Sequence, residues 1–464
     1  MTPHQLRLLA NNMNILGIDI GTTTITALIL DTCSNSVIAC KTLKNDSFIE
    51  GRDFEKLQDP QTILDTVKSA VADVTESLEI HAIGVTGQMH GILYLDKENK
   101  PCSPLMIWQD ERGNLPYNGT TYAAYLTEKT GYKAASGFGL TTHFYNTVNN
   151  EIPENAVKLS TIHDYIVSVL TGSDPVTHSS DAASLGFFDL EKSAFDTAAI
   201  SSVGMDCSFL PKVLYTTSLA GKTNCEFLPS GIPVSVAIGD NQASFLGSVA
   251  APENSVLVNV GTGSQISFIT HSTTAPSCGE IRPLTDGSNI FVGASLCGGR
   301  AYAVLKNFFS MCADMLGGSK DNLYAVMDAL SEDVFTQKDS LIVNCEFCGT
   351  RDNPEGRGSI TNISDSNLTP KGLITGVLKG VCEELHNMYT IADDLLISEP
   401  STLVCSGNGL RKSAIWREIF KNSFSLETQL PKHSEEAATG ACIFASVASK
   451  IFPNINEAQN TLLR

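Results

Sequence analysis

The sequence predicts an α/β protein made of two duplicated domains with a cleft between them. A chain of 464 residues is too long for one hydrophobic core. Residues 18–22, Ile-Asp-Ile-Gly-Thr, and residues 258–262, Val-Asn-Val-Gly-Thr, carry an apolar strand into the same Gly-Thr turn near the start of two similar halves. In the first half, strand-like segments alternate with a helical one, which is typical of an α/β layer with a mixed sheet.

Five segments of the first half have strand character, and one has helical character. The strands are expected at residues 14–20, 22–31, 36–43, 81–86 and 91–95. The helix follows Pro60, because apolar residues then recur at spacings of three and four. These residues are Ile63, Leu64, Val67, Val71, Val74 and Leu78.

The boundary between the halves is expected at residues 247–255, where Gly-Ser-Val-Ala-Ala-Pro-Glu-Asn-Ser interrupts the pattern. We therefore divide the chain into an N-terminal extension, 1–13, a first domain, 14–249, and a second domain, 250–464. The second domain is expected to contain a strand and four helices. The strand is expected at 402–406, and the helices are expected near 298–316, 371–395, 413–424 and 435–450.

The composition excludes several classes of function. Hydrophobic residues make up 42% of the chain, and the net charge of −19 argues against broad electrostatic binding of nucleic acid or anionic membranes. Thirteen cysteines lack the regular spacing of a secreted disulfide scaffold. No secretory signal or bilayer-spanning apolar run is evident. We expect a cytoplasmic monomer or homodimer that binds neither nucleic acid nor membranes.

Two turns are candidates for binding phosphate. Glycines and hydroxyls at a tight bend expose donors to phosphate oxygens. The first turn consists of Gly21, Thr22, Thr23 and Thr24, and the second contains Gly261, Thr262 and Gly263. An ordinary hairpin is the alternative interpretation of each turn.

Two carboxylates stand beside strand ends. Asp19 lies two residues before Gly21, where the first turn begins. It could hold Mg²⁺, which favours oxygen ligands and keeps much of its hydration. Asp240 ends an apolar run and follows Gly239, where a carboxylate could accept a hydroxyl proton during phosphoryl transfer. Asp240 could instead cap a helix that begins near Gln242.

Two short segments have side chains suited to a sugar. Gln88, Met89 and His90 lie between two predicted strands and offer an amide, a thioether and an imidazole to hydroxyls and a carbon face. Residues 108–112, which include Trp108 and Asp110, add an aromatic wall and charged groups. The alternatives are a structural histidine and a charged helix start.

A further glycine-rich segment follows the predicted strand at 402–406. It contains Gly407, Asn408, Gly409 and Ser413. Glycines at such a position let a flat ligand approach the backbone, and the helix that follows favours negative charge. The segment lacks the Gly-x-Gly-x-x-Gly spacing, so a dinucleotide fold is not supported.

Taken in order, these segments resemble the FGGY carbohydrate kinases, and the resemblance runs from about residue 14 to residue 450. It implies two actin/hexokinase-like (ribonuclease H-like) domains with a central interdomain cleft, and ATP and Mg²⁺ as cofactors. It makes Asp240 the base, Asp19 the carboxylate that faces Mg²⁺, and Thr22 and Thr23 phosphate ligands. Gln88, Met89 and His90 would line the sugar site, with Trp108 and Asp110 beside them. The implied nucleotide contacts are Gly261, Thr262, Gly263, Gly298, Gly299, Gly407, Asn408, Gly409 and Ser413.

Within the family, the Gly-Gln-Met-His-Gly segment at 87–91 is similar to both five-carbon and seven-carbon ketose kinases. Motifs that contain Gln109 and Gln242 look most like the sedoheptulokinases. The resemblance therefore implies phosphorylation of sedoheptulose to its 7-phosphate, with D-xylulose or a catalytically silent sugar-binding scaffold as alternatives. Thr26 stands where relatives commonly have Lys or Arg, and Ser413 where many have Asn. These departures leave the transition-state cation unassigned and the adenine contacts open.

Overall fold

The computed structural model describes residues 13–330, 339–350, 353 and 355–464, and these form two compact units. Unit 1 comprises residues up to Ala250 together with Arg282–Ser288 and Lys432–Arg464, and unit 2 comprises Ala251–Ile281 and Asn289–Pro431. The predicted N-terminal extension lies, apart from residue 13, outside the described residues. The compact units differ from the linear division at residue 250, because the C-terminal segment packs on the sheet of unit 1.

Unit 1 is organised around a seven-stranded sheet. Its strands, in spatial order, are β16 (Leu219–Lys222), β17 (Pro233–Ser235), β6 (Ala82–Gly87), β1 (Asn14–Ile20), β2 (Thr24–Asp31) and β3 (Ser36–Lys44), with β18 (Ile238–Gly239) also paired to β6. β1 runs antiparallel to β2 and parallel to β6. The five predicted strands of the first half are confirmed within a few residues of their predicted ends.

Helices cover the sheet because it buries apolar side chains on both faces. α2 (Pro60–Thr75) is capped by Asp59 and buries Ile63, Val67, Val71 and Val74 against β2 and β3, as its periodicity predicts. α14 (Glu436–Ala448) packs on β1, β6 and α8 (Asp240–Ser248). Any side chain at Gly84 would collide with the backbone of α14, so only glycine allows this approach.

The rest of unit 1 contains short strands and helices, many of which pack around a second apolar cluster. The helices are α3 (Tyr122–Thr130), α4 (Gly139–Val148), α5 (Ile162–Thr171), α6 (Ser179–Leu185), α7 (Thr197–Ser202) and α15 (Ile455–Leu462). The strands are β4 (Phe48–Ile49), β5 (Leu57–Gln58), β7 (Leu93–Leu95), β8 (Leu105–Met106), β9 (Pro116–Tyr117), β10 (Thr120–Thr121), β11 (Lys158–Ser160), β12 (Val176–His178), β13 (Phe188–Asp189), β14 (Ala194–Phe195) and β15 (Lys212–Leu214).

The sheet of unit 2 repeats the topology of unit 1. β19 (Ser255–Val260) is antiparallel to β20 (Ser264–Thr270) and parallel to β25 (Thr402–Ser406). β22 (Asn289–Ser295) continues the sheet beside β20, and β26 (Glu427–Gln429) continues it beside β25. Each unit thus has a central strand between an antiparallel hairpin partner and a parallel strand. The predicted duplication of an α/β domain is confirmed.

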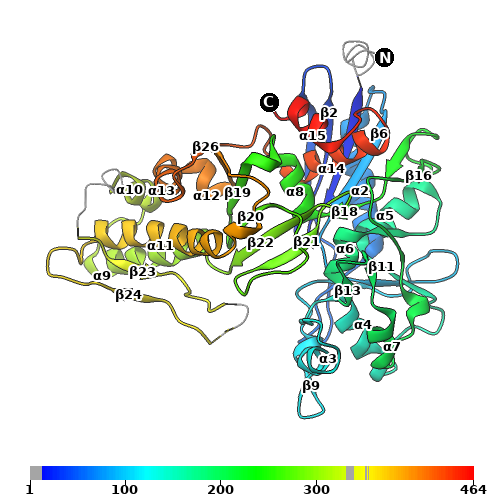
Figure 1. Cartoon of the computed structure of the whole chain (residues 1–464), viewed down its shortest axis with the longest axis horizontal. Coiled ribbons are helices and arrows are strands. Elements are labelled where there is room, and N and C mark those ends of the chain that lie inside the picture. Colours follow the sequence, from blue (N-terminus) through cyan, green and yellow to red (C-terminus); the bar gives the residue numbers. More distant parts are fainter. Residues whose placement is uncertain (1–12, 331–338, 351–352, 354) are drawn as a thin grey trace. The chain divides into compact units, whose positions relative to one another are not determined.

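Three helices of unit 2 match the segments predicted near 298–316, 371–395 and 413–424, two shorter ones were not predicted, and the segment predicted at 435–450 is α14 of unit 1. The helices of unit 2 are α9 (Gly299–Leu316), α10 (Leu323–Leu330), α11 (Pro370–Ile391), α12 (Gly407–Lys412) and α13 (Ala414–Phe424), and the strands β21 (Glu280–Pro283), β23 (Ile342–Asn344) and β24 (Ser359–Thr361) complete the list. α11 is the longest helix in the described part of the chain and runs beside α9 and β23 (Figure 1).

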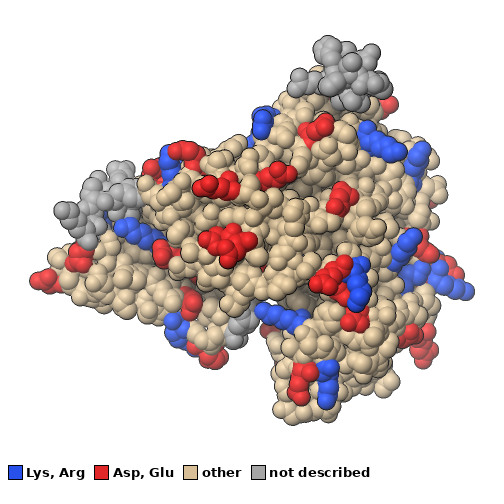
Figure 2. Space-filling view, viewed as in Figure 1, with Lys and Arg blue, Asp and Glu red and all other residues tan. Residues whose placement is uncertain are grey.

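Within the described ranges, no helix is both long and apolar enough to cross a bilayer. On the face drawn in Figure 2, acidic and basic side chains are interspersed, and basic groups do not gather into one broad patch. The visible charge distribution agrees with the acidic composition.

Candidate active site

In unit 1, three neighbouring strands end together. β1 and β18 both run parallel to β6, and Ile20 and Gly239 both pair with Gly87. Asp19 precedes the end of β1, and Asp240 follows the end of β18 as the first residue of α8. The carboxyl ends of parallel strands meet at one edge of a sheet, and both carboxylates therefore lie at this edge, as their positions in the sequence predict.

The two carboxylates affect each other electrostatically. Burial, Asp240 and Glu435 raise the pKa of Asp19 to about 7, while His163 opposes the shift. Burial and Asp181 raise the pKa of Asp240 to about 6, against the opposing effects of His163, the Asn241 backbone and Arg282. A carboxylate with a raised pKa and a like-charged neighbour is a common property of functional sites. Asp19 and Asp240 are therefore candidates for residues that act in the chemistry of this site.

The first turn is tied to the predicted sugar segment. The Thr22 hydroxyl donates a hydrogen bond to Oε1 of Gln88 at 3.1 Å, and Trp108 Nε1 donates to Thr22 Oγ1 at 3.0 Å. Gln88 Nε2 donates to Gln58 Oε1 at 2.7 Å, and Gln58 Nε2 donates to the Thr22 carbonyl at 2.8 Å. The turn is therefore fixed by side chains, whereas the neighbouring Thr23 and Thr24 are exposed.

Met89 and His90 have different environments. Met89 is buried, and a Cβ at Gly239 would lie 2.7 Å from its terminal methyl group, so the thioether packs directly beneath the turn that leads to Asp240. His90 has a positive φ of 72° and stacks on Phe138 with ring centroids 4.8 Å apart. Its Nδ1 lies 2.7 Å from the Ser184 carbonyl oxygen. The ring is held by these contacts at the edge of the site.

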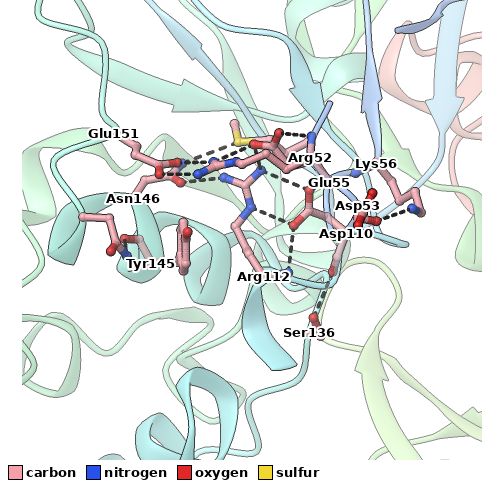
Figure 3. A network of polar contacts seen from close by, with 12 residues as sticks. Arg52, Asp53, Glu55, Lys56, Asp110, Arg112, Ser136, Tyr145, Asn146 and Glu151 are labelled. Carbon is pink, nitrogen blue, oxygen red and sulfur yellow. Dashed lines mark hydrogen bonds and ion pairs between the residues drawn. The ribbon is translucent and has the colours of Figure 1, made fainter. Parts of the chain in front are cut away.

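Trp108 and Asp110 are close in sequence but differ in solvent exposure. Trp108 is 46% exposed and can form the predicted aromatic wall. Asp110 is 1% exposed, and its oxygens accept hydrogen bonds from Arg112 Nε at 2.7 Å, Arg112 Nη2 at 3.0 Å and the Lys56 backbone N–H at 3.1 Å. Figure 3 shows Asp110 inside this network. Asp110 therefore forms a buried ion pair with Arg112.

Two other residues have structural surroundings that sequence reasoning did not foresee. Gln242 is completely buried, and its Nε2 donates to the Pro283 carbonyl at 3.0 Å. Thr26 pairs with Asp19 across the hairpin, and its hydroxyl lies 2.9 Å from that of Thr42.

In unit 2, the predicted nucleotide residues meet at the ends of β19 and β25. Gly298 N–H donates to the Thr262 carbonyl at 2.9 Å, and Gly299 N–H donates to the Gly261 carbonyl at 2.7 Å. Gly263 packs against this second segment, because a Cβ there would lie 2.7 Å from the Ser295 carbonyl oxygen. The turn at 261–263 and the segment at 298–299 are therefore joined by backbone hydrogen bonds.

The segment after β25 completes this glycine cluster. Gly407 has a φ of +81°, and a Cβ there would lie 2.6 Å from the Val260 carbonyl oxygen. A Cβ at Gly409 would lie 2.9 Å from Val260 Cγ1, whereas Asn408 is exposed. Ser413 Oγ accepts a hydrogen bond from the Trp416 N–H at 3.2 Å and caps α13. Its hydroxyl therefore has a structural partner.

Sequence reasoning missed three titratable residues near the carboxylates. His163 and Asp181 form a completely buried ion pair, and Glu435 acts on Asp19 from the segment before α14. The available signal was a His-Asp pair at the start of an apolar helix and an acidic residue before the small-residue run 437–441. Neither pattern reveals its partner, because each partner is distant in the sequence.

Known proteins similar to this chain are sugar kinases. A human (Homo sapiens) sedoheptulokinase is 26% identical, with 92% of this chain and 96% of that protein covered. A gluconokinase from Bacillus subtilis is 25% identical, with 94% and 87% covered. The crystal structure of a xylulose kinase from Rhodospirillum rubrum matches with a TM-score of 0.83 at 20% identity, over 97% of this chain and 93% of that chain, which supports the fold.

The family assignment rests on a match over half of the sequence. The model of the N-terminal domain of the FGGY family of carbohydrate kinases matches residues 14–247. This stretch contains both carboxylates and the whole Thr22–Gln88–Trp108 hydrogen-bond network. The chain belongs to the FGGY family of carbohydrate kinases.

Proposed function

We propose that this carbohydrate kinase transfers the γ-phosphoryl group of ATP to a ketose, with sedoheptulose as substrate and sedoheptulose 7-phosphate as product. The observation that carries the proposal is the convergence of Asp19 and Asp240 at neighbouring strand ends, beside the Gln88 network. One carboxylate can accept a proton while the other faces a cation. A silent scaffold has no need to place one carboxylate where it raises the pKa of the other.

Asp240 is assigned as the general base. The hydroxyl oxygen of the sugar forms a bond to the γ-phosphorus of ATP. The bond between the γ-phosphorus and the oxygen that bridges the β- and γ-phosphates breaks, ADP leaves, and the hydroxyl proton passes to Asp240. Phosphoryl transfer depends mainly on positioning and on charge stabilisation. Gln88 and His90, held by their hydrogen bonds, would orient the sugar, and Trp108 would pack against its carbon face.

The residues at the site suit Mg²⁺. Asp240 and Glu435 both raise the pKa of Asp19, and a divalent cation would relieve this unfavourable interaction. Among the residues that the structure describes, no group of three or more His, Cys, Asp or Glu side chains forms a cage, and Mg²⁺ is usually held by one or two carboxylates and by substrate phosphates. Asp19 would hold the ion. When bound, Mg²⁺ neutralises charge on the transferring phosphate.

The nucleotide is assigned to the glycine cluster of unit 2. Gly261, Gly263 and Gly298 leave the backbone uncovered by side chains, and Gly407 and Gly409 do the same after β25. Such backbone suits the close approach of phosphates and a flat base. Thr22 and Thr23, in the first turn, are proposed separately as phosphate ligands. A cytoplasmic setting is supported by the thirteen free cysteines.

The choice of sedoheptulose is supported by the 26% identity to the human sedoheptulokinase over most of both chains. Specificity constants with D-xylulose, D-fructose and sedoheptulose at fixed MgATP test it. We expect kcat/KM for sedoheptulose to exceed that for D-xylulose about tenfold or more, because a shorter sugar leaves buried polar groups unpaired. Equal or reversed constants would remove the seven-carbon assignment. Absence of ATP consumption with every ketose would favour the scaffold.

A further inference from the structure

A buried ion pair lies behind the turn that carries Asp240, and the proposed chemistry does not use it. His163 is in the first turn of α5, and Asp181 belongs to α6. Nε2 of His163 lies 3.0 Å from Oδ1 of Asp181, and neither side chain is exposed. Burying an ion pair is costly, so the pair is weak evidence of a purely stabilising role.

A hydrogen-bonded series connects the ion pair to the turn. Ser180 Oγ lies within hydrogen-bond reach of the other oxygen of Asp181, Oδ2, at 3.3 Å, and of Nδ1 of His178 at 2.9 Å. The same hydroxyl oxygen accepts a hydrogen bond from the Gly239 N–H at 3.1 Å. Gly239 is the N-cap residue of α8 and directly precedes Asp240. The series therefore runs from His163 through Asp181 and Ser180 to the backbone next to the base.

His163 also reaches the turn from its other side. A Cβ at Gly87 would lie 3.3 Å from Nδ1 of His163, so the imidazole packs on the end of β6. Gly87 and Gly239 are paired in the register between β6 and β18. The ion pair thus contacts both of the strand ends beside Asp240, one through Ser180 and the other through the imidazole ring.

We propose that His163, Asp181 and Ser180 are positioning residues that hold Gly239, and with it the carboxylate of Asp240, in the orientation required to accept the substrate proton. The proposal rests on the proposed function, because it takes Asp240 as the base. A misplacement of about 1 Å can cost on the order of 10²-fold in rate. The charges agree with this arrangement, since Asp181 and His163 act on the pKa of Asp240 in opposite directions.

The decisive variant is Ser180→Ala, which removes the acceptor of the Gly239 N–H. We expect kcat to fall about 10- to 100-fold per folded molecule, with KM for ketose and MgATP within about threefold of wild type. Ser180→Thr, which retains a hydroxyl, should recover kcat. The matched control is Thr223→Val, because buried Thr223 Oγ1 accepts the Ile232 N–H at 2.9 Å in the same unit. Thr223→Val should keep the wild-type kcat.

The series predicts non-additive effects. If His163 acts through Ser180, the double variant His163→Gln/Ser180→Ala loses no more kcat than the worse single variant. Wild-type kcat in Ser180→Ala, or fully additive losses in the double variant, would overturn the proposal. If His163→Gln does not fold, Ser180→Ala and its control still decide. Unimpaired turnover in Asp240→Asn would instead remove the base assignment on which the inference rests, so the two failures are distinguishable.

Discussion

Oε1 of Gln88 accepts a hydrogen bond from the Thr22 hydroxyl at 3.1 Å, and this contact joins the predicted sugar segment to the predicted phosphate turn. The two residues are distant in the sequence and meet because β1 and β6 are parallel neighbours in the sheet. The orientation of a side chain that would contact the sugar is therefore coupled to the turn that would contact phosphate. A change at either residue should disturb both.

Gln88→Leu should lower the free energy of unfolding by about 1–3 kcal/mol. The substitution leaves the buried amide oxygen of Gln58 without the hydrogen bond that Gln88 Nε2 donates at 2.7 Å. Urea denaturation of the two proteins measures the difference. Gln61→Leu, on the exposed side of α2, is the control and should change stability by less than about 0.5 kcal/mol. Equal losses in both variants would contradict the role of the Gln88 contacts.

Much of the fold could be predicted because its central elements have clear local patterns. β1 and β25 match their predicted residues, since each is a short apolar run that ends at a turn. α2 was predicted from its spacing and from Pro60. The packing of α14 on β1 could not be predicted, because no local pattern reveals a contact between segments so far apart in the chain.

The candidate site was only partly predictable for the same reason. Asp19 and Asp240 follow recognisable strand ends, but burial decides what a neighbouring polar residue does. Asp110 accepts hydrogen bonds from Arg112, and the Gln242 amide donates one to a backbone carbonyl. The local pattern around His163 does not reveal Asp181, because the two residues meet only through a tertiary contact between two helices.

The activity should fall on the acid side as Asp240 becomes protonated. Its folded-state pKa is about 6, raised from 3.8. Only the ionised carboxylate can accept the hydroxyl proton, so kcat/KM should be constant above this pKa and should fall about tenfold per pH unit well below it. A pH profile of kcat/KM with a stable buffer series measures this. An activity that remains constant down to about pH 4 would contradict the assignment of Asp240 as the base.

The His163–Asp181 pair should stabilise the protein most at lower pH. Burial lowers the pKa of His163, but Asp181, with smaller contributions from Asp164 and Asp240, raises it to about 9 from 6.5. The folded state therefore holds the proton more tightly, and the contribution is full below about pH 6.5 and is lost as the pH rises through 9. The difference in unfolding free energy between wild type and His163→Gln should shrink across this window. A difference that grows would contradict the ion pair.

Gly407→Ala should weaken nucleotide binding as well as stability. The new Cβ would lie 2.6 Å from the Val260 carbonyl oxygen at a φ of +81°. We expect a loss of about 1–3 kcal/mol in unfolding free energy and a raised KM for MgATP. Gly317→Ala is the matched control, because Gly317 has a φ of +67° in the same unit with nothing near its Cβ position. Gly317→Ala should destabilise less and should leave the KM unchanged.

The most direct test of the central claim is the turnover of Asp240→Asn at saturating ketose and MgATP. The amide preserves the shape of the side chain at the start of α8 but cannot accept the hydroxyl proton at neutral pH. We predict that kcat falls about 10²- to 10⁴-fold, while the melting temperature and the dissociation constant for ketose stay close to those of the wild type. A variant that folds, binds the ketose and turns over at nearly the wild-type rate would contradict the account.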